Sequence, residues 1–556
     1  MVNFQHMPKP AAVASALACL VAGALLVGAT RSERPAQTSK VVALVHVNVI
    51  PMDRERVLVG RTIIVRDGII TTISAADSVV VPADAQVFHG GDSVYVIPGL
   101  SDMHVHLRYE SDLMLLLANG VTTVRNMRGT PWHLQMRKQV AQGERIGPRI
   151  FTAGPILYGF RGAGSTAAEA RALVDSQAAA GYDFVKVYDR LPRSSYDAVV
   201  AEAGVKRLPV AGHIVSGATY GSGLDEALAA RQASIEHAEQ FVYHFFGNDL
   251  DRSRIPLMAS RVKAAGTTVV PTLVVVPALA DQWDKHDSVM KRPEMRFVHP
   301  ETYAWWRGDR GHASAINHVL MPFLDDIVRG LRDAQVPLMA GTDFYIFGTV
   351  AGFSLHDELA ALVHAGLTPY EALAAATSTP AAYLGDSAHS GTVAVGKRAD
   401  LVILRGNPLV NIHNSTRILG VVAAGRLFEH AELGRMLDSL ASAFAFQHRF
   451  VDDVTVRGAA SMLLRQPSAR DQVAESTLNQ LATDLARAKR WPDAVAVGEF
   501  GVRARPTSRD AWLLLSSVAL QKADTASAAA VIARGLARIP GDSVLLRTRA
   551  GLLHSH

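Results

Sequence analysis

Short apolar runs with strand character alternate with helical segments between residues 97 and 386, and this alternation restricts the fold more than any other feature of the chain. Strand and helix in regular alternation indicate an α/β fold with a parallel sheet and helical crossovers. With Val96–Leu100 as the first strand, the expected strands continue through Thr122–Val124, Arg149–Phe151, Phe184–Val187, Val210–Ala211, Ser234–Ile235, Thr268–Val270 and Leu338–Ala340. Eight strands in about 290 residues suit a closed (β/α)8 barrel of the TIM type. The alternative, a doubly wound open sheet, requires a Gly-rich phosphate turn after the first strand, and none is present.

Two β-rich blocks flank the expected barrel, which spans residues 97–386. From Val41 to about Val96, short β-rich runs alternate with turn signals such as Asp67-Gly68, and no long helical period appears. A second block begins near Gly391 and closes around Leu427. We therefore expect residues 40–96 and 387–430 to form one composite β-sandwich domain.

The chain after Arg435 is rich in Ala, Leu and Arg and has helical character. Aligning residues 476–509 with 510–542 places Leu478 on Trp512 and Pro506 on Pro540. The offset of about 34 residues resembles the period of tetratricopeptide repeats. Because such units need neighbours that cover their faces, residues 435–556 are expected to dock on the barrel or on another chain. An ordinary helical tail with a chance period is the alternative.

Residues 1–39 have the character of an export signal followed by a linker. An uncharged segment of about twenty residues runs from Ala11 to Thr30, with Lys9 before it and Arg31 after it, as in a cleavable signal peptide or a membrane anchor. Its many Ala and Gly residues favour cleavage over a stable span, and lipidation of Cys19 is a further alternative. Each interpretation places the protein in the periplasm or outside the cell.

Composition excludes several classes of protein. The chain has 556 residues, 49% apolar content and a net charge of +5, so it can bury several cores, and its scattered basic residues offer nucleic acid no concentrated patch. Cys19 is the only cysteine, which excludes an intramolecular disulfide framework, a cysteine zinc site and an iron–sulfur cluster. Any metal must therefore be held by histidine, carboxylate or lysine-derived ligands.

His104 and His106 follow the apolar run Val96–Leu100. Alternate residues of a strand point the same way, so both imidazoles are expected to face one point in the mouth of the barrel. A lone His-x-His is weak evidence, because many such pairs are only polar strand residues. The case depends on the residues that end later strands, where barrel enzymes place catalysis.

Four more candidate side chains lie at or near the ends of expected strands, and they are Lys186, His213, His237 and Asp343. A buried ammonium is costly, so Lys186 requires a partner or a depressed pKa. It either snorkels at a strand end or is carboxylated by CO₂ to a carbamate whose oxygens bridge two metal ions. Each of the other three could equally be a satisfied polar residue, but all lie on the catalytic face of the expected barrel.

Longer motifs surround these residues. They are Pro98–His106, Glu236-His237, Gly341-Thr342-Asp343, Gly366–Pro369 with Glu371–Leu373, and Gly396–Val402 followed by Asn407–Leu409. With these motifs the chain from about Val41 to Leu427 resembles the amidohydrolase superfamily, in the branch of imidazolonepropionase-like enzymes and metal-dependent Xaa-Pro or Xaa-Arg dipeptidases. The stretch Gly159–Ser165 departs from that branch, whose relatives often carry a substrate-binding histidine in this loop.

The resemblance implies a role for each candidate. His104 and His106 would bind the more buried ion, carboxylated Lys186 would bridge two ions, His213 and His237 would bind the second, and Asp343 would contact the first. Without the carbamate a one-metal site remains, as in relatives that use the first two histidines, a later histidine and the aspartate. Nitrogen and oxygen ligands suit Zn²⁺, which we expect as a pair of ions, and tolerate Mn²⁺, Co²⁺ or Fe²⁺.

Asp343 is also the expected catalytic residue. Water on a metal ion has a pKa of about 7 instead of about 15.7, and Asp343 would take its proton and pass it to the leaving nitrogen. Substrate contacts are expected from Tyr243, His244 and Tyr345, which lie just past His237 and Asp343, although each could equally pack a loop. An insertion between Pro277 and His318 has the character of a lid with aromatic and cationic anchors.

The sequence therefore predicts an exported metal-dependent amidohydrolase that cleaves a C–N bond in a small cyclic amide, N-acyl amino acid or dipeptide. An esterase, lactonase or phosphotriesterase on the same site is one alternative, because a hydroxide is indifferent to the leaving atom. A non-catalytic scaffold built on the C-terminal repeats is the other. Beyond the small-molecule substrate, the expected partners are a protein or a second copy at the C-terminal helices, and a membrane at the N-terminal segment.

Overall fold

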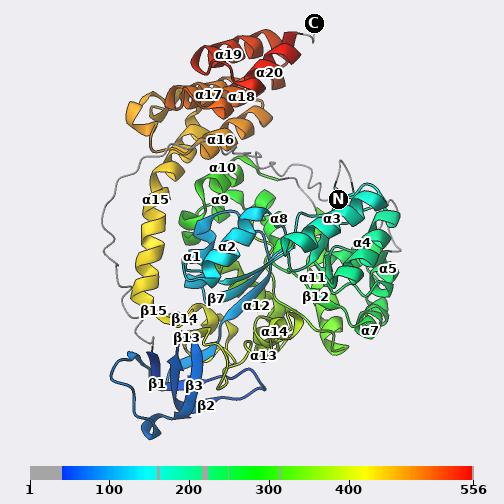
Figure 1. The fold of residues 1–556 in the computed structure, drawn as a ribbon, viewed down its shortest axis with the longest axis vertical. Coiled ribbons are helices and arrows are strands. Elements are labelled where there is room, and N and C mark those ends of the chain that lie inside the picture. Colours follow the sequence, from blue (N-terminus) through cyan, green and yellow to red (C-terminus); the bar gives the residue numbers. More distant parts are fainter. Residues whose placement is uncertain (1–40, 160–162, 216–222, 248, 312–314, 554–556) are drawn as a thin grey trace, which may run out of the picture. The chain divides into compact units, whose positions relative to one another are not determined.

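A computed structural model describes residues 41–159, 163–215, 223–247, 249–311 and 315–553. These residues form a mixed α/β fold in which two sheet systems are followed by a series of helices (Figure 1). The predicted signal peptide or anchor in residues 1–39 lies outside the described residues. Within the described part of the chain, no helix combines the length and the apolar character needed to cross a bilayer.

The first sheet joins the two β-rich blocks, which are far apart in the sequence. Its eight strands are β1 (Val41–Val49), β2 (Leu58–Arg66), β3 (Ile69–Ala75), β4 (Gln86–His89), β5 (Val94–Pro98), β13 (Leu401–Arg405), β14 (Ile418–Ala423) and β15 (Arg426–Glu429). The junction is the antiparallel pair β5 and β13, in which Val402 lies opposite Ile97. Buried aliphatic side chains from both blocks, such as Leu44, Val96 and Ile403, pack into one cluster.

The second system contains parallel strands only. They are β6 (Leu100–Val105), β7 (Val121–Asn126), β8 (Arg149–Thr152), β9 (Val185–Val187), β10 (Val210–Gly212), β11 (Ser234–Glu236) and β12 (Thr268–Val270). A parallel bridge joins Ala153 to Phe184 and so connects the end of β8 with the start of β9. This parallel pairing confirms the α/β class that the alternation of strand and helix predicted.

The predicted first barrel strand, Val96–Leu100, is wrong as a single element. The structure divides it at Gly99: β5 ends at Pro98 and belongs to the first sheet, whereas β6 begins at Leu100. The N–H of Gly99 donates to the carbonyl of Asp400, and a Cβ at this position would lie 2.1 Å from the hydroxyl of Thr122. A glycine is therefore required where the chain passes from one sheet to the other.

The predicted strand Leu338–Ala340 is not a continuous strand. Its backbone alternates between partners, because the N–H of Met339 donates to Val269 while that of Ala340 donates to Ala375. Two single parallel bridges, Val269 to Leu338 and Val105 to Phe344, nevertheless connect this segment with β12 on one side and β6 on the other. Asp343 therefore lies between β6 and β12.

Helices follow most of the parallel strands and pack around them (Figure 1). They are α1 (Glu110–Ala118), α2 (Pro131–Ala141), α3 (Ala167–Ala180), α4 (Arg193–Lys206), α5 (Gly223–Ala229), α7 (Ile255–Ala265), α11 (Ala315–Asp333) and α12 (Phe353–His364). The insertion before α11 contains α8 (Val275–Asp284), α9 (His286–Val289) and α10 (Pro300–Gly308). Trp306 of α10 is 1% exposed and is part of the main apolar core.

The chain after residue 430 is helical. It consists of α15 (His430–Arg457), α16 (Glu475–Arg487), α17 (Trp491–Ala504), α18 (Arg509–Gln521), α19 (Thr525–Arg538) and α20 (Ser543–Leu553). The starting residues of α16, α18 and α20 are evenly spaced in the sequence, and those of α17 and α19 are separated by the same interval. Both α15 and α16 contact α10 of the insertion.

Candidate metal centre

His104 and His106 lie at the carboxyl end of β6, next to the segment that carries Asp343. Oδ1 of Asp343 lies 2.9 Å from Nε2 of His106 and 3.4 Å from Nε2 of His104. One ligand atom from each of the three residues lies within 4.8 Å of the others, which is compatible with a shared metal ion. His104 is 1% exposed, whereas the side chain of His106 is 20% exposed, so solvent reaches the cluster from the His106 side.

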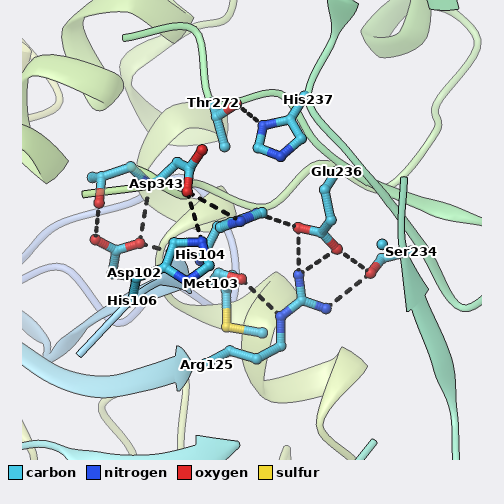
Figure 2. A network of polar contacts seen from close by, with 12 residues as sticks. Asp102, Met103, His104, His106, Arg125, Ser234, Glu236, His237, Thr272 and Asp343 are labelled. Atoms are coloured by element: carbon cyan, nitrogen blue, oxygen red, sulfur yellow. Dashed lines mark hydrogen bonds and ion pairs between the residues drawn. The ribbon is translucent and has the colours of Figure 1, made fainter. Parts of the chain in front are cut away.

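His213 and His237 directly follow β10 and β11 and extend this cluster. The ring centroid of His237 lies 4.6 Å from that of His104 and 4.8 Å from that of His213. The Nδ1 of His237 lies 2.8 Å from the hydroxyl of Thr272 (Figure 2), and its Nε2 forms no hydrogen bond with the described residues. His237, Thr272 and Asp343 all have positive φ, and such strained backbone is concentrated at functional sites.

Lys186 is the central residue of β9 and is 1% exposed. Among the described residues, no hydrogen bond or ion pair holds its ammonium group. Burial lowers the pKa of Lys186 to about 8, although the carboxylates of Glu236 and Asp343 partly oppose this shift. An amine with such a pKa is largely neutral in mildly alkaline solution and is available as a nucleophile.

Burial and nearby positive charge keep the histidines neutral. They lower the pKa of His104 and His213 well below the ordinary value and that of His237 to about 3. Burial would raise the pKa of Asp343, but its hydrogen bond with His106 and the positive charge of Lys186 help to hold that pKa below its usual value. Neutral imidazoles and an ionised carboxylate are the forms that coordinate metal ions.

A divalent cation fits the donor set of these residues. Nδ1 of His213 is buried and lies 3.9 Å from Oδ1 of Asp189, but it forms no hydrogen bond in the described part of the chain, and a buried polar atom without a hydrogen bond is costly unless a ligand satisfies it. His104, His106 and Asp343 are a possible metal site, and their imidazole and carboxylate donors are of the kind that binds Zn²⁺, Mn²⁺, Co²⁺ or Fe²⁺.

Polar residues behind the cluster hold the ring of His104 in one orientation. Figure 2 shows Glu236 between His104 and Arg125. Its Oε2 lies 2.9 Å from Nδ1 of His104, and both of its oxygens accept from the guanidinium of Arg125 at 2.7 and 2.8 Å. A carboxylate at Nδ1 retains a proton there and directs Nε2 toward the cluster.

Asp102 is a second buried carboxylate beneath the cluster. It accepts from the hydroxyl of Thr342 at 2.7 Å and from the backbone N–H groups of His104 and Thr342. Burial raises the pKa of Asp102 to about 7 despite these bonds. It ties β6 to the segment before Asp343, and so fixes the spacing of the two.

The sequence did not assign a role to Glu236, Arg125 or Asp102. A signal existed, because each is a charged residue within a predicted or adjoining strand segment, and all three are fully buried in the structure. Such residues require buried partners, but a sequence does not identify the partner.

The three predicted substrate contacts lie in different environments. Tyr345 is buried, and its hydroxyl donates to the carboxylate of Asp112. His244 is also buried, in the π-helical turn η3 (Val242–Phe246), and its Nδ1 has no partner among the described residues. Tyr243 is half-buried against the main apolar core.

The insertion between Pro277 and His318, which the sequence predicts to be a lid, packs on the C-terminal helices through α10. Arg307 and Arg310 each pair with Asp287, and Arg307 also pairs with Asp452 of α15. Both arginines therefore already have carboxylate partners inside the chain. Trp283, in contrast, is 51% exposed.

Comparison with known proteins identifies the family. The model of the amidohydrolase family matches residues 95–428, which include the whole cluster. The chain belongs to the amidohydrolase family. It is a metal-dependent hydrolase that acts on carbon–nitrogen bonds. No curated protein sequence matches it.

Several solved structures are similar to it. One is a bottromycin amidohydrolase with 26% identity and a TM-score of 0.59, over 73% of this chain and 90% of that one. A Xaa-Pro dipeptidase with bound methionine has 22% identity and a TM-score of 0.54, over 70% and 100%. An ochratoxinase of A. niger has 20% identity and a TM-score of 0.51, over 70% and 96%.

Proposed function

We propose that this amidohydrolase uses two metal ions, with Zn²⁺ as the first choice, to hydrolyse the amide bond of a small substrate. The ions would be held by His104 and His106 on one side and by His213 and His237 on the other. The observation that carries the proposal is that His104 and His106 lie within 3.4 Å of Asp343, while the rings of His237 and His213 extend this cluster.

A carbamate on Lys186 would bridge the two ions. The proposal is supported by the burial of Lys186, by its lowered pKa and by the absence of a partner for its ammonium group among the described residues. A bridging carbamate would convert a costly buried cation into an anionic ligand between the two ions. Without the carbamate, a single ion could still be held by His104, His106, one later histidine and Asp343.

The residues of the chain have separate tasks in this mechanism. When bound, a divalent ion polarises the scissile carbonyl and lowers the pKa of water to about 7. Asp343, which is ionised, accepts a proton at its carboxylate and delivers it to the leaving nitrogen. Glu236 holds the ring of His104 in place through Nδ1.

The proposed substrates are small molecules: a dipeptide, an N-acyl amino acid or a cyclic amide. The similarity to a Xaa-Pro dipeptidase and to a bottromycin amidohydrolase supports this class. Ester, lactone and phosphotriester substrates are the alternative on the same site, because the mechanism does not depend on the leaving atom.

Metal analysis combined with Asp343→Asn tests the proposal. The purified protein should contain one to two equivalents of metal ion, and Asp343→Asn should lose activity by about 10²–10⁴-fold while it retains at least half of the metal. Asp386→Asn, a change at an aspartate paired with Arg149 and Arg398 away from the cluster, serves as the control. A metal content well below one equivalent, or an active Asp343→Asn, would contradict the proposal and favour the non-catalytic scaffold.

We also propose the arrangement of the rest of the chain. Residues 97–386 would form the closed (β/α)8 barrel, which is supported by the unbroken series of parallel bridges from β6 through β12 to Phe344. Residues 40–96 with 387–430 would form the β-sandwich domain. Residues 435–556 would form tetratricopeptide-like units that also accept a protein partner, which the even spacing of the helices supports. Export by residues 1–39 completes the proposal.

A further inference from the structure

Arg108 lies beside the metal cluster but has no role in it. It follows His106 by two residues at the exit of β6 and is half-buried, and its positive charge acts on His106. Among the described residues its guanidinium forms no hydrogen bond and no ion pair. Because a guanidinium forms strong, often bidentate hydrogen bonds with carboxylates, an arginine without such a partner beside the cluster is a candidate for binding an anion.

Two aromatic rings hold this guanidinium. Its central carbon lies 4.8 Å from the ring centroid of Tyr345 and 5.6 Å from that of Trp305. Rings on a guanidinium orient it and exclude water from its faces, while its N–H edge remains open to a planar anion. The indole N–H of Trp305 is buried and also has no acceptor among the described residues.

Asp112 interacts with the charge of Arg108, but among the described residues it forms no ion pair or hydrogen bond with the guanidinium. Asp112 accepts from the backbone N–H groups of Arg108 and Tyr109, both at 2.9 Å, and from the hydroxyl of Tyr345. It therefore fixes the turn and the tyrosine, and it leaves the guanidinium without a hydrogen-bonded counter-ion.

The helix α10 connects this arginine with the C-terminal helices. One face of α10 meets the site: Trp305 lies on Arg108, and the hydroxyls of Thr302 and Tyr109 are 3.2 Å apart. The opposite face carries Tyr303 and Arg307, which are four residues apart and so lie on one side of the helix. Both are bonded to Asp452 of α15 at 3.0 to 3.2 Å.

We propose that Arg108 binds a carboxylate of the substrate, and that Asp452 is a positioning residue that acts on it through α10. The inference rests on the proposed hydrolase function and narrows its substrates to anionic ones, such as N-acyl amino acids and dipeptides, over neutral cyclic amides. Carboxylates match the planar N–H edge of a guanidinium, because two parallel hydrogen bonds can form. The C-terminal helices thereby become part of the substrate site.

Steady-state kinetics of the metal-loaded full chain test the inference with pairs of substrates. Each pair is an N-acetyl amino acid or a dipeptide and the same compound with its carboxylate amidated. In Arg108→Gln, KM for the acid should rise about tenfold or more, with kcat within about threefold, while KM for the amide is unchanged. Arg193→Gln, which removes an exposed arginine of α4, should alter neither.

A matched pair of variants tests the positioning role. Asp452→Asn should raise KM for the acid about threefold or more without a change in kcat. Asp453→Asn should leave KM unchanged, because Asp453 pairs with Arg457 and Ser461 inside the C-terminal segment instead. Equal effects of the two neighbours would overturn the positioning role.

A binding measurement separates failure of this inference from failure of the hydrolase proposal. Calorimetry with 4-phenylbutyrate and 4-phenylbutanol, which cannot be hydrolysed, should show a preference of about tenfold for the acid that Arg108→Gln removes. If no substrate is turned over but this preference holds, the hydrolase proposal fails and the carboxylate site remains. Equal binding of acid and alcohol, or a preference that Arg108→Gln retains, overturns the inference.

Discussion

The same pair of residue types, arginine and glutamate, occurs in two regions of this molecule with opposite exposure. Arg125 and Glu236 join β7 and β11 beneath the metal cluster, and both side chains are 0% exposed. Arg534 and Glu499 join α19 and α17 of the C-terminal helices, and their side chains are 50% and 27% exposed. Both pairs have two N–H···O contacts of 2.7 to 3.0 Å.

Besides their exposure, the two pairs differ in the additional hydrogen bonds that their side chains form. Arg125 also donates to the carbonyl of Met103 and to the hydroxyls of Ser234 and Tyr383, while Glu236 also bonds to His104. Desolvation makes a buried pair expensive unless every donor and acceptor is satisfied. The buried pair therefore serves to orient a ligand rather than to add stability, whereas the exposed pair contributes little to either.

Removal of the buried negative charge of Glu236 should lower the stability of the protein more than any other change to the two pairs. Glu236→Gln leaves the guanidinium of Arg125 buried without a counter-ion, and should lower the free energy of unfolding by about 3–5 kcal/mol. Urea-induced unfolding of the metal-free protein measures this loss. Glu499→Gln is the matched control on the exposed pair, and a difference of less than about 1 kcal/mol between the two variants would show that burial does not distinguish the regions.

The dependence of stability on pH should also distinguish buried from exposed residues, here through the buried, neutral side chain of His356. Burial lowers the pKa of His356 to about 4, although its bond to the carbonyl of Asn119 opposes the shift. As the pH falls from 6.5 to 4, the unfolded chain binds this proton before the folded one, so the free energy of unfolding decreases. This residue should account for about 3 kcal/mol of the decrease.

Chemical unfolding at several pH values between 6.5 and 4 measures the slope of the free energy of unfolding against pH. His356→Gln, which retains a donor for Asn119, should have a shallower dependence of stability on pH than the wild type. His389→Gln, at an exposed position, should not change the slope. Equal slopes in all three proteins would refute the assignment.

Sequence patterns gave the α/β class and the approximate place of the parallel strands, because burial on both faces produces apolar runs that can be recognised locally. They also pointed to His104, His106 and Asp343, which the structure brings together, because strand ends share one edge. Local patterns did not reveal the division at Gly99, which depends on a contact with Thr122. They also missed the bond between Arg125 and Glu236, whose partners are distant in the sequence.

Replacement of both charges by apolar side chains separates the two tasks of the buried pair. The double variant Arg125→Met, Glu236→Met leaves no unpaired charge. Its free energy of unfolding should therefore be about 2 kcal/mol higher than that of Glu236→Gln. Because Nδ1 of His104 then has no acceptor, the metal affinity should still be about 10–100-fold below that of the wild type. Competition with a chelator measures the affinity, and wild-type affinity in this variant would contradict the orienting role of Glu236.

The exposed pair should show the smallest effect. A double-mutant cycle of Arg534→Ala and Glu499→Ala isolates the coupling between the two side chains from the other contacts of Arg534, which also lies 5.3 Å from the ring of Trp512. The coupling should be about 0.2–1 kcal/mol, and it should vanish at about 1 M salt because exposed charges are screened. A coupling as large as the loss in Glu236→Gln would mean that geometry alone, and not burial, determines the strength of such pairs in this chain. A coupling that survives high salt would lead to the same conclusion, since only charges withdrawn from solvent escape screening.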